Sequence, residues 1–193
     1  MKKIKRLIAF DFDGTLANSP EPETGKQIWL AKTGEKFPYS GWWGRKESLD
    51  MNIFDIKMFP SMVKQLKFEQ SKPDTYVMVL TSRRDDLRPE VQAILDANDI
   101  HVDSLDMQRV EQSKGAKILR YIGHIPELEE ISVYDDRESD IESYESIRSQ
   151  IPEGIAFNIY LANKGSFVLT ELEVNDKLTH IIMEEIKKFN PPK

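Results

Sequence analysis

The sequence predicts an α/β fold with a central parallel sheet between two layers of helices. Short apolar segments alternate with longer helical patterns along the chain, and this alternation is typical of parallel sheets. Polar residues suited to catalysis follow three of the apolar segments, at the edge of the sheet where ligands bind. The 193 residues and 39% hydrophobic content suit one domain with a core. We therefore expect a single Rossmann-like three-layer sandwich over residues 1–193.

Each element is predicted from an apolar run and its periodicity. Five strands are expected near residues 6–11, 76–81, 100–105, 131–135 and 155–161. Six helices are expected near residues 24–33, 60–70, 87–98, 114–123, 139–149 and 175–189. Residues 18–70, which separate the first two strands, are predicted to form a small helical, cap-like insertion. A late hairpin is also expected, because Asn163-Lys164-Gly165 separates FNIYLA from SFVLTE.

The first strand lies within IAFDFDGTL at residues 8–16 and leads into two acidic residues, Asp11 and Asp13. Side chains two positions apart in an extended strand point the same way, so both carboxylates face one spot while Phe12 turns back to the protein. Two such anions repel each other unless a cation lies between them. Mg²⁺ prefers one or two carboxylates together with waters and phosphate oxygens. The segment therefore predicts a phosphate-handling metal site.

Four segments, in this order, resemble the signature motifs of the haloacid dehalogenase (HAD) superfamily, whose members are mostly aspartate-nucleophile phosphatases. The first is DFDGT, and the second is YVMVL leading into Thr81-Ser82-Arg83. The third is a lysine at the start of a later helix, in SKGAKILRYI, and the fourth is ISVY ending in Asp135-Asp136. Together they cover residues 8–140. The resemblance implies a HAD-like fold and a Mg²⁺-dependent phosphatase.

The resemblance also implies catalytic roles. Asp11 would be the nucleophile that forms an aspartyl-phosphate, and Asp13 would protonate the leaving alkoxide and then activate water. Thr81 would offer its hydroxyl, and the following backbone at Ser82 would help to form an anion-binding concavity. A lysine would offset negative charge on the nucleophile and the phosphoryl group. We favour Lys117, which directly precedes ILRYI and lies 19 positions before Asp136, with Lys114 as the alternative.

The expected metal ligands are acidic residues near the first and fourth motifs. The resemblance gives the usual ligand position to Asp136, if Asp135 stands where many relatives carry glycine or serine. Asp140 would orient a metal-bound water or a ligand, although the helix dipole also favours an acid in a first turn. The predicted cofactor is Mg²⁺, and its predicted ligands are Asp11, Asp13, Asp135, Asp136 and Asp140.

The predicted insertion contains all three tryptophans of the chain, Trp29, Trp42 and Trp43. Trp42 and Trp43 would stack on a base, and Arg45 and Lys46 beside them would pair with phosphate. Alternatively, one or both tryptophans anchor a short insertion to the core.

Further segments carry a narrower resemblance. FDFDGTLANSP, GWW, LTSR and DDR resemble the Swiss-army-knife RNA-repair-like branch, and VLTSR and YDDR resemble the 3′-phosphatase part of polynucleotide kinase-phosphatases. In that comparison Arg83 would contact phosphate and Arg137 would brace the acidic loop. The implied substrates are nucleic-acid 3′-phosphate ends or nucleotides. A small phosphorylated metabolite is the alternative substrate, and the net charge of -6 favours it. A non-catalytic module that binds phosphate or nucleic-acid ends is the alternative class of protein.

Composition excludes several other functions. Without cysteine the chain has no disulfide, no thiolate nucleophile and no zinc-thiolate site. The apolar run in MKKIKRLIAF is shorter than the roughly 7–15 residues of a signal peptide, and no stretch approaches the roughly 20 apolar residues of a membrane span. No kinase P-loop, GxxxxGK[ST], is present. We therefore expect a cytoplasmic protein with no membrane partner, and the sequence leaves its protein partners open.

Overall fold

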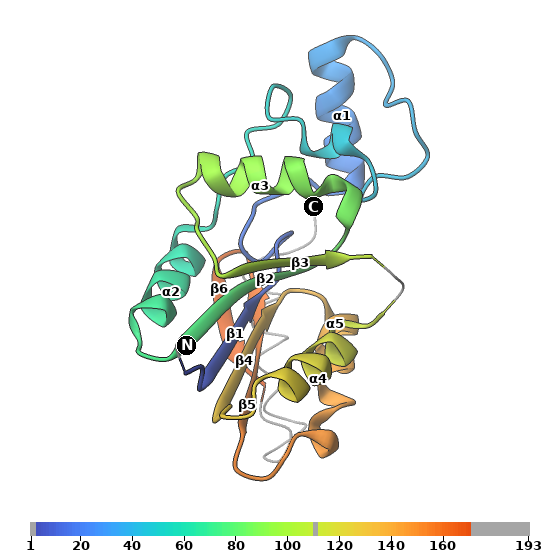
Figure 1. Ribbon diagram of the computed structural model, residues 1–193. Helices are drawn as coiled ribbons and strands as arrows, with labels where there is room; N and C mark the ends of the chain where they lie inside the picture. The colour runs from blue at the N-terminus through green and yellow to red at the C-terminus, as the bar shows by residue number, and fades with distance from the viewer. Residues whose placement is uncertain (1–2, 110–111, 171–193) are drawn as a thin grey trace.

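The computed structural model describes residues 3–109 and 112–170, which form a six-stranded sheet with helices on both faces (Figure 1). The strands are β1 Arg6–Phe10, β2 Thr75–Arg84, β3 Ser104–Gln108, β4 Glu130–Asp135, β5 Ala156–Asn163 and β6 Ser166–Leu169. Their order is β3-β2-β1-β4-β5-β6, and every neighbouring pair is parallel except β5 and β6. The predicted α/β class with a central parallel sheet is confirmed.

Five of the predicted helices are present close to their expected bounds. They are α1 Pro22–Thr33, α2 Pro60–Ser71, α3 Arg88–Ala97, α4 Lys114–His124 and α5 Glu138–Glu145. Short 3-10 helices occupy Lys46–Leu49, Asp85–Leu87 and Arg148–Gln150. The helix predicted near 175–189 lies outside the described residues. No helix among the described residues has both the length and the apolar character needed to cross a membrane.

The third strand begins later than the predicted 100–105. The residues that follow α3 are used to close that helix: Asp99 has a φ of 54°, and the Ile100 N–H donates to the Leu95 carbonyl oxygen at 3.0 Å. Asp103 then accepts a hydrogen bond from the Val77 N–H of β2 at 2.8 Å. Regular pairing with β2 therefore starts only at Ser104.

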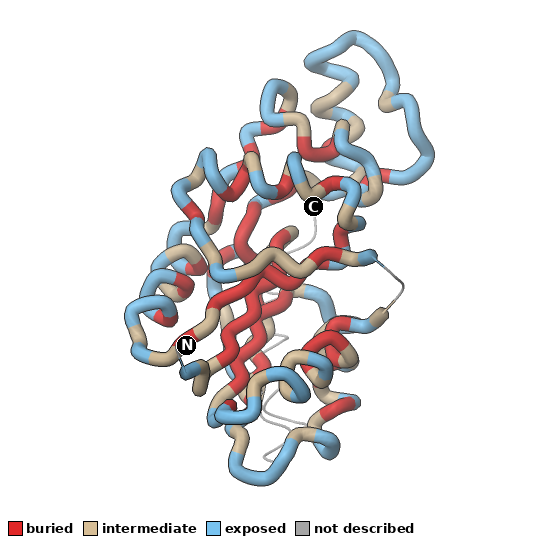
Figure 2. Tube along the Cα trace, in the orientation of Figure 1, coloured by how far each residue is buried: buried red, intermediate tan, exposed pale blue. Residues whose placement is uncertain are grey.

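Alternate side chains of β1 enter two separate cores. Ile8 and Phe10 belong to the core beneath α2 and α3, whereas Leu7 and Ala9 belong to the core beneath α4 and α5. Buried residues accordingly follow the strands through the centre of the molecule (Figure 2). Because both faces are covered, ligands can reach the sheet at its edges and strand ends, and the carboxyl ends of β1, β2 and β4 meet at one such place.

The predicted late hairpin is confirmed. β5 and β6 pair in antiparallel fashion, with Asn163 opposite Ser166. The two residues between them, Lys164 and Gly165, have φ values of 45° and 90°. Two consecutive positive φ angles are the requirement of the two-residue turn whose twist matches that of paired strands.

The chain between β1 and α2 leaves the sheet, and α1 lies beyond the sheet edge (Figure 1, upper part). Trp42 holds this segment together: its side chain is buried, its Nε1 donates to the Pro20 carbonyl oxygen at 3.0 Å, and its ring packs against Phe37 and Phe54. A β carbon on Gly25 of α1 would lie 2.2 Å from the Trp42 ring, so glycine permits the close approach. Trp42 is thus an anchor of the segment, which corrects its predicted role in substrate binding.

Candidate active site

A cavity of about 460 Å³ opens at the carboxyl ends of the central strands. Eight residues predicted from the sequence as site residues line it: Asp11, Asp13, Trp43, Thr81, Ser82, Arg83, Lys114 and Asp136. Glu21 and Gln108 also line the cavity and were not predicted. Segments far apart in the sequence therefore converge at this edge of the sheet.

Asp11 and Asp13 reach the cavity from a tight turn at the end of β1. The strand itself ends at Phe10, but the Asp11 N–H still donates to the Tyr134 carbonyl oxygen of β4 at 2.9 Å. Phe12, between the two acids, is fully buried in the core. The two acids line the cavity and Phe12 is buried, as the sequence predicts, although all three residues lie beyond the end of the regular strand.

Gly14 brings this turn into contact with the end of β4. Its φ is 74°, and a β carbon there would lie 2.1 Å from Asp136 Oδ2, so no larger residue fits without movement. The next residue, Thr15, donates from Oγ1 to Asp136 Oδ1 at 3.4 Å. The Gly-Thr pair therefore places the first acidic segment directly against the second.

Lys114 places its ammonium among the buried carboxylates. Nζ lies 2.6 Å from Asp11 Oδ1, 2.6 Å from Asp135 Oδ2 and 3.2 Å from Asp140 Oδ2. Burial acts to lower the pKa of Lys114, but the charges of Asp11 and Asp135 outweigh it and raise that pKa well above its usual value. The side chain is therefore a fixed cation at neutral pH.

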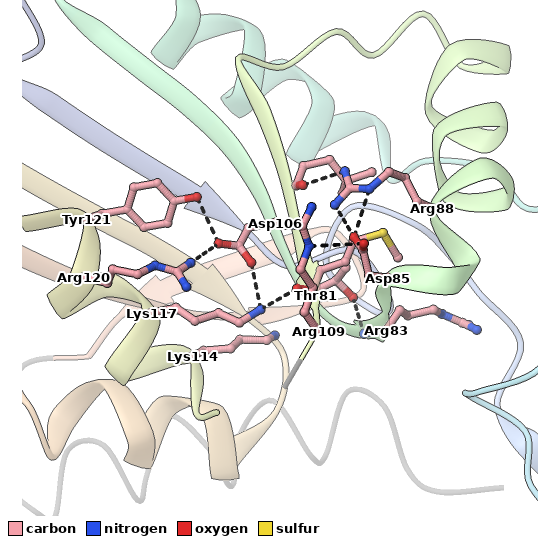
Figure 3. A network of polar contacts seen from close by, with 12 residues as sticks. Thr81, Arg83, Asp85, Arg88, Asp106, Arg109, Lys114, Lys117, Arg120 and Tyr121 are labelled. Carbon is pink, nitrogen blue, oxygen red and sulfur yellow. Dashed lines mark hydrogen bonds and ion pairs between the residues drawn. The ribbon is translucent and has the colours of Figure 1, made fainter. Parts of the chain in front are cut away.

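Lys117, which we favoured from the sequence for this place, points elsewhere. Its Nζ bonds Asp106 Oδ1 at 2.9 Å and the Met107 carbonyl oxygen at 3.1 Å, both on β3 (Figure 3). The reason is the start of α4: Ser113 Oγ accepts the Ala116 N–H at 3.2 Å, so Ser113 is the N-cap and Lys114 the first helical residue. The structure thus puts the alternative, Lys114, beside Asp11.

Three carboxylates form a compact acidic group. Asp11, Asp135 and Asp136 each offer an oxygen, and these oxygens lie within 4.8 Å of one another. Burial raises the pKa of Asp11 well above its usual value, in opposition to Lys114. Burial, and then repulsion from Asp135, raises the pKa of Asp136 to about 6. One ammonium does not neutralise three carboxylates, so the group fits a hard divalent cation such as Mg²⁺.

The other two predicted metal ligands lie outside this group and have different partners. Asp140 faces Lys114 and lies 4.0 Å from Arg137 Nε. Asp13 receives two hydrogen bonds from Arg83: Nε donates to Oδ2 at 2.7 Å and Nη2 donates to Oδ1 at 2.9 Å. Paired forks of this kind fix the orientation of a carboxylate as well as its charge.

Arg83 also ties the segment before α2 to the site. Its Nη1 donates to the Trp43 carbonyl oxygen and to Ser48 Oγ, both at 2.8 Å. The guanidinium is buried and each of its three nitrogens has a protein acceptor. In this structure Arg83 positions Asp13, which differs from its predicted contact with phosphate.

Of the remaining residues predicted to contact substrate, Trp43 lines the cavity and Arg45 does not. Trp43 is 37% exposed, lines the cavity and lies with its ring centroid 5.2 Å from the Arg83 Cζ atom. Arg45 is not among the residues that line the cavity, because it stacks on the Tyr39 ring at 4.4 Å. Of the three residues predicted in GWWGR, Trp43 alone is at the cavity.

Comparisons with known proteins address the fold. No protein-family model matches the chain, and no curated protein matches it at a significant level. The structure of effector Ceg4 from Legionella pneumophila superposes with a TM-score of 0.53 and 17% identity, over 99% of this chain and 97% of that one. The HAD domain of effector Lem4 from the same organism superposes with a TM-score of 0.52 and 15% identity, over 96% of this chain and 95% of that one. The chain has a HAD-like fold.

A third solved structure shares this HAD-like fold. It is a chain of a Pnkp1/Rnl/Hen1 complex, with a TM-score of 0.52 and 16% identity. The superposition covers 85% of this chain and 48% of the other, so this chain spans about half the length of that relative. At these identities the likeness concerns the fold.

Two further residues support the site without a signal in the sequence. Tyr144 of α5 is buried and donates its hydroxyl to Asp135 Oδ2 at 3.2 Å. Ser48 accepts from Arg83, as described above. An isolated serine or tyrosine has no motif that marks it, and only the packing of α5 and the 3-10 helix Lys46–Leu49 brings these side chains to the site.

Proposed function

We propose that this protein is a Mg²⁺-dependent phosphomonoesterase that works through an aspartyl-phosphate intermediate. One observation carries the proposal: Asp11 and Asp13 line one cavity from a single turn, and the Lys114 ammonium lies 2.6 Å from Asp11. Phosphate monoesters hydrolyse extremely slowly in water. A covalent intermediate divides this difficult step into two easier ones.

In the proposed mechanism a carboxylate oxygen of Asp11 attacks phosphorus while the leaving oxygen takes a proton from Asp13. Asp13, then ionised, accepts a proton from the water that cleaves the aspartyl-phosphate, and phosphate is released. Arg83 holds Asp13 in orientation for both steps through its two hydrogen bonds. Lys114 offsets negative charge on Asp11, and Thr81 and Ser82 face the transferred phosphoryl oxygens.

The residues that would hold Mg²⁺ are Asp11, Asp135 and Asp136, whose oxygens are mutually close. When bound, the ion supplies positive charge for the phosphoryl oxygens and for the nucleophile. The raised pKa values of Asp11 and Asp136 fit this assignment, because burial and crowding leave their negative charges under-compensated by protein groups. Chelation of the metal is therefore expected to abolish turnover.

We further propose that residues 18–70 act as a small cap on a single domain, 1–193. Two contacts support this: Arg83 of β2 donates to the Trp43 carbonyl oxygen and to Ser48 Oγ, so the segment is joined to the residue that holds Asp13. The ring of Trp43 then forms part of the cavity wall. A small cap leaves the cavity open enough for the end of a polymer.

The proposed substrates are nucleic-acid 3′-phosphate ends or nucleotides. The resemblance of VLTSR and YDDR to the 3′-phosphatase part of polynucleotide kinase-phosphatases supports this, as does the fold shared with a chain of a Pnkp1/Rnl/Hen1 complex. The second candidate is a small phosphorylated metabolite, which the net charge of -6 favours. A non-catalytic phosphate- or end-binding module is the rival without turnover.

The experiment that tests the function is phosphate release with Mg²⁺ across a matched panel. The panel contains 3′- and 5′-phosphorylated RNA and DNA oligomers, the corresponding mononucleotides and several sugar phosphates, each with and without EDTA. We expect release that needs Mg²⁺ and is fastest from oligomers with 3′ phosphates. Fastest release from sugar phosphates would assign the metabolite role, and no release from any substrate would leave a binding module.

Trp43 and Trp42 are expected to respond differently to alanine. Trp43→Ala should lower kcat/KM for the preferred substrate by about tenfold more than for a small aryl phosphate, because a nucleobase has a larger face to stack on the ring than a small aryl group has. Trp42→Ala should instead lower the free energy of unfolding by about 3–5 kcal/mol, since it empties a buried aromatic site. Steady-state kinetics and denaturant melts measure the two effects. An equal loss on both substrates in Trp43→Ala would indicate a structural tryptophan.

A further inference from the structure

A second pocket, of about 310 Å³, lies along strand β3 and the first turns of α4. Strand β3 is the edge of the sheet, because β2 is its one neighbour among the described strands. Cationic side chains from α3, from the residue after β3 and from α4 surround the pocket: Arg88, Arg109, Lys117 and Arg120 (Figure 3). The proposed phosphatase mechanism uses none of these residues.

Among the described residues, fewer carboxylates than cations take part in the ion pairs of this pocket. Asp106 accepts from Lys117 Nζ at 2.9 Å and from Arg120 Nη2 at 2.7 Å. Asp85 accepts from Arg88 Nε at 3.0 Å and from Arg109 Nε at 3.2 Å. Within residues 3–109 and 112–170, these four cations thus share two carboxylates, in a chain whose net charge is -6.

Two of the four cations have an evident structural task. Arg88 Nη1 donates to the Leu105 carbonyl oxygen at 2.9 Å and Lys117 Nζ to that of Met107 at 3.1 Å. These contacts satisfy carbonyl groups of an edge strand and protect that edge from pairing with another chain. Protection of the edge accounts for Arg88 and Lys117.

Arg109 and Arg120 have no such task. Their side chains are 74% and 47% exposed. Within residues 3–109 and 112–170, the Arg109 guanidinium donates through Nε and the Arg120 guanidinium through Nη2, and the remaining nitrogens of both have no acceptor there. Planar guanidinium groups with free donors bind phosphate oxygens in pairs. These two arginines are the groups available for an anionic ligand.

The second pocket shares a wall with the active-site cavity. Gln108, at the end of β3, lines the cavity, whereas Met107 and Arg109 on either side of it line the second pocket. Lys114 likewise lines the cavity, and Lys117, one turn further along α4, lines the second pocket. The two pockets therefore lie next to each other, at the end of β3 and the start of α4.

We propose that the second pocket binds an internal phosphate of an oligonucleotide whose terminal phosphate lies at Asp11. The inference rests on the proposed function and deepens it, because it selects polymer ends over free nucleotides. Each pocket has an aromatic ring in its wall: Trp43 in the cavity, and in the second pocket Tyr121, whose ring centroid lies 5.6 Å from the guanidinium of Arg120. Aromatic faces beside cations suit bases and phosphates, whereas an acidic peptide would need only the cations.

The test uses the full chain carrying Arg109→Gln and Arg120→Gln together. The matched control is Lys67→Gln. This change removes an exposed cation of α2, which pairs with Asp99 and lines neither pocket. For each protein kcat/KM is measured on a terminally phosphorylated oligonucleotide, the mononucleotide, an aryl phosphate and an acidic phosphopeptide. The oligonucleotide series is repeated over a range of salt concentrations.

We expect the double variant to lose about tenfold or more in kcat/KM on the oligonucleotide relative to the aryl phosphate. The slope of log(kcat/KM) against log[salt] should become shallower by about 1 to 2, the change expected when one or two phosphate contacts are lost. The Lys67→Gln control should show neither effect. An unchanged oligonucleotide preference, an equal loss on all substrates, or a preference of the wild type for the acidic phosphopeptide would each overturn the inference.

A binding measurement distinguishes a protein without phosphatase activity from a second pocket that binds no oligonucleotide. If the wild type hydrolyses no substrate, binding of a fluorescent oligonucleotide with a terminal phosphate is followed by anisotropy in wild type and double variant. Binding that weakens about tenfold in the double variant supports the pocket without turnover. Equal binding by the two proteins overturns it.

Discussion

Replacing Asp11 by asparagine should lower kcat on an aryl phosphate by about 10⁴-fold or more, the scale of loss when a covalent nucleophile is removed. The amide keeps the shape of the side chain but cannot form an acyl phosphate with the substrate. The protein should remain folded, because burial raises the pKa of Asp11 and the folded state therefore disfavours its charge. Asp135 also remains as a partner for Lys114 at 2.6 Å. Phosphate release and a thermal melt measure both outcomes.

The intermediate itself gives a second readout for Asp11. Rapid acid quench of wild type with radiolabelled substrate should trap phosphate on the protein, and Asp11→Asn should trap none. Asp55→Asn is the matched control, because that carboxylate is exposed and paired with Lys57 at the surface. Retained turnover in a folded Asp11→Asn protein would refute the proposed mechanism whatever the substrate.

The sequence was sufficient for the sheet because a buried strand leaves a direct pattern in the chain. The apolar run that ends at Phe10 predicts a strand covered on both faces, and the structure places its alternate residues in two cores. A polar residue directly after such a run must lie at the carboxyl edge of the sheet. Asp11, Thr81 and Asp136 could therefore be placed near one another from the sequence, and all three line one cavity.

Side-chain partners were harder to predict, since they depend on local geometry that a strand pattern does not contain. Arg83 lies at the carboxyl end of a strand like other site residues, yet its guanidinium donates to Asp13, Trp43 and Ser48. Trp42 and Trp43 are adjacent in sequence but face opposite environments, because one side chain fills the space beneath α1 and the other faces the cavity. Neither outcome has a sequence signal that composition or spacing would reveal.

The choice between two lysines shows how a small signal can decide a site. Lys114 and Lys117 differ by three positions, and helical spacing alone would place both on the same side of α4. The deciding feature is Ser113, an N-cap that makes Lys114 the first helical residue and directs its ammonium to the sheet edge. The capping serine is visible in the sequence as Ser-Lys-Gly-Ala-Lys at residues 113–117. It favours Lys114, whereas the sequence separation from Asp136 favours Lys117.

Replacing Lys114 by methionine should therefore lower kcat by about 10²–10³-fold, the usual loss when one fixed positive group at a developing charge is removed. Lys117→Met is the matched control, and its loss on an aryl phosphate should stay below about tenfold, since its ammonium bonds Asp106 and Met107. Lys114→Met should also destabilise the fold by about 3–5 kcal/mol, because it leaves Asp11 and Asp135 buried without their shared cation. Steady-state kinetics and denaturant melts measure the three effects.

The origin of that destabilisation can itself be tested. If the loss comes from stranded carboxylates, the double change Lys114→Met and Asp11→Asn should be more stable than Lys114→Met alone, since it removes one of the unpaired charges. Added Mg²⁺ should raise the melting temperature of Lys114→Met, because the ion and the missing ammonium would neutralise the same carboxylates, Asp11 and Asp135. A larger loss of kcat in Lys117→Met than in Lys114→Met, in folded proteins, would assign the catalytic charge to Lys117 and contradict the geometry of α4.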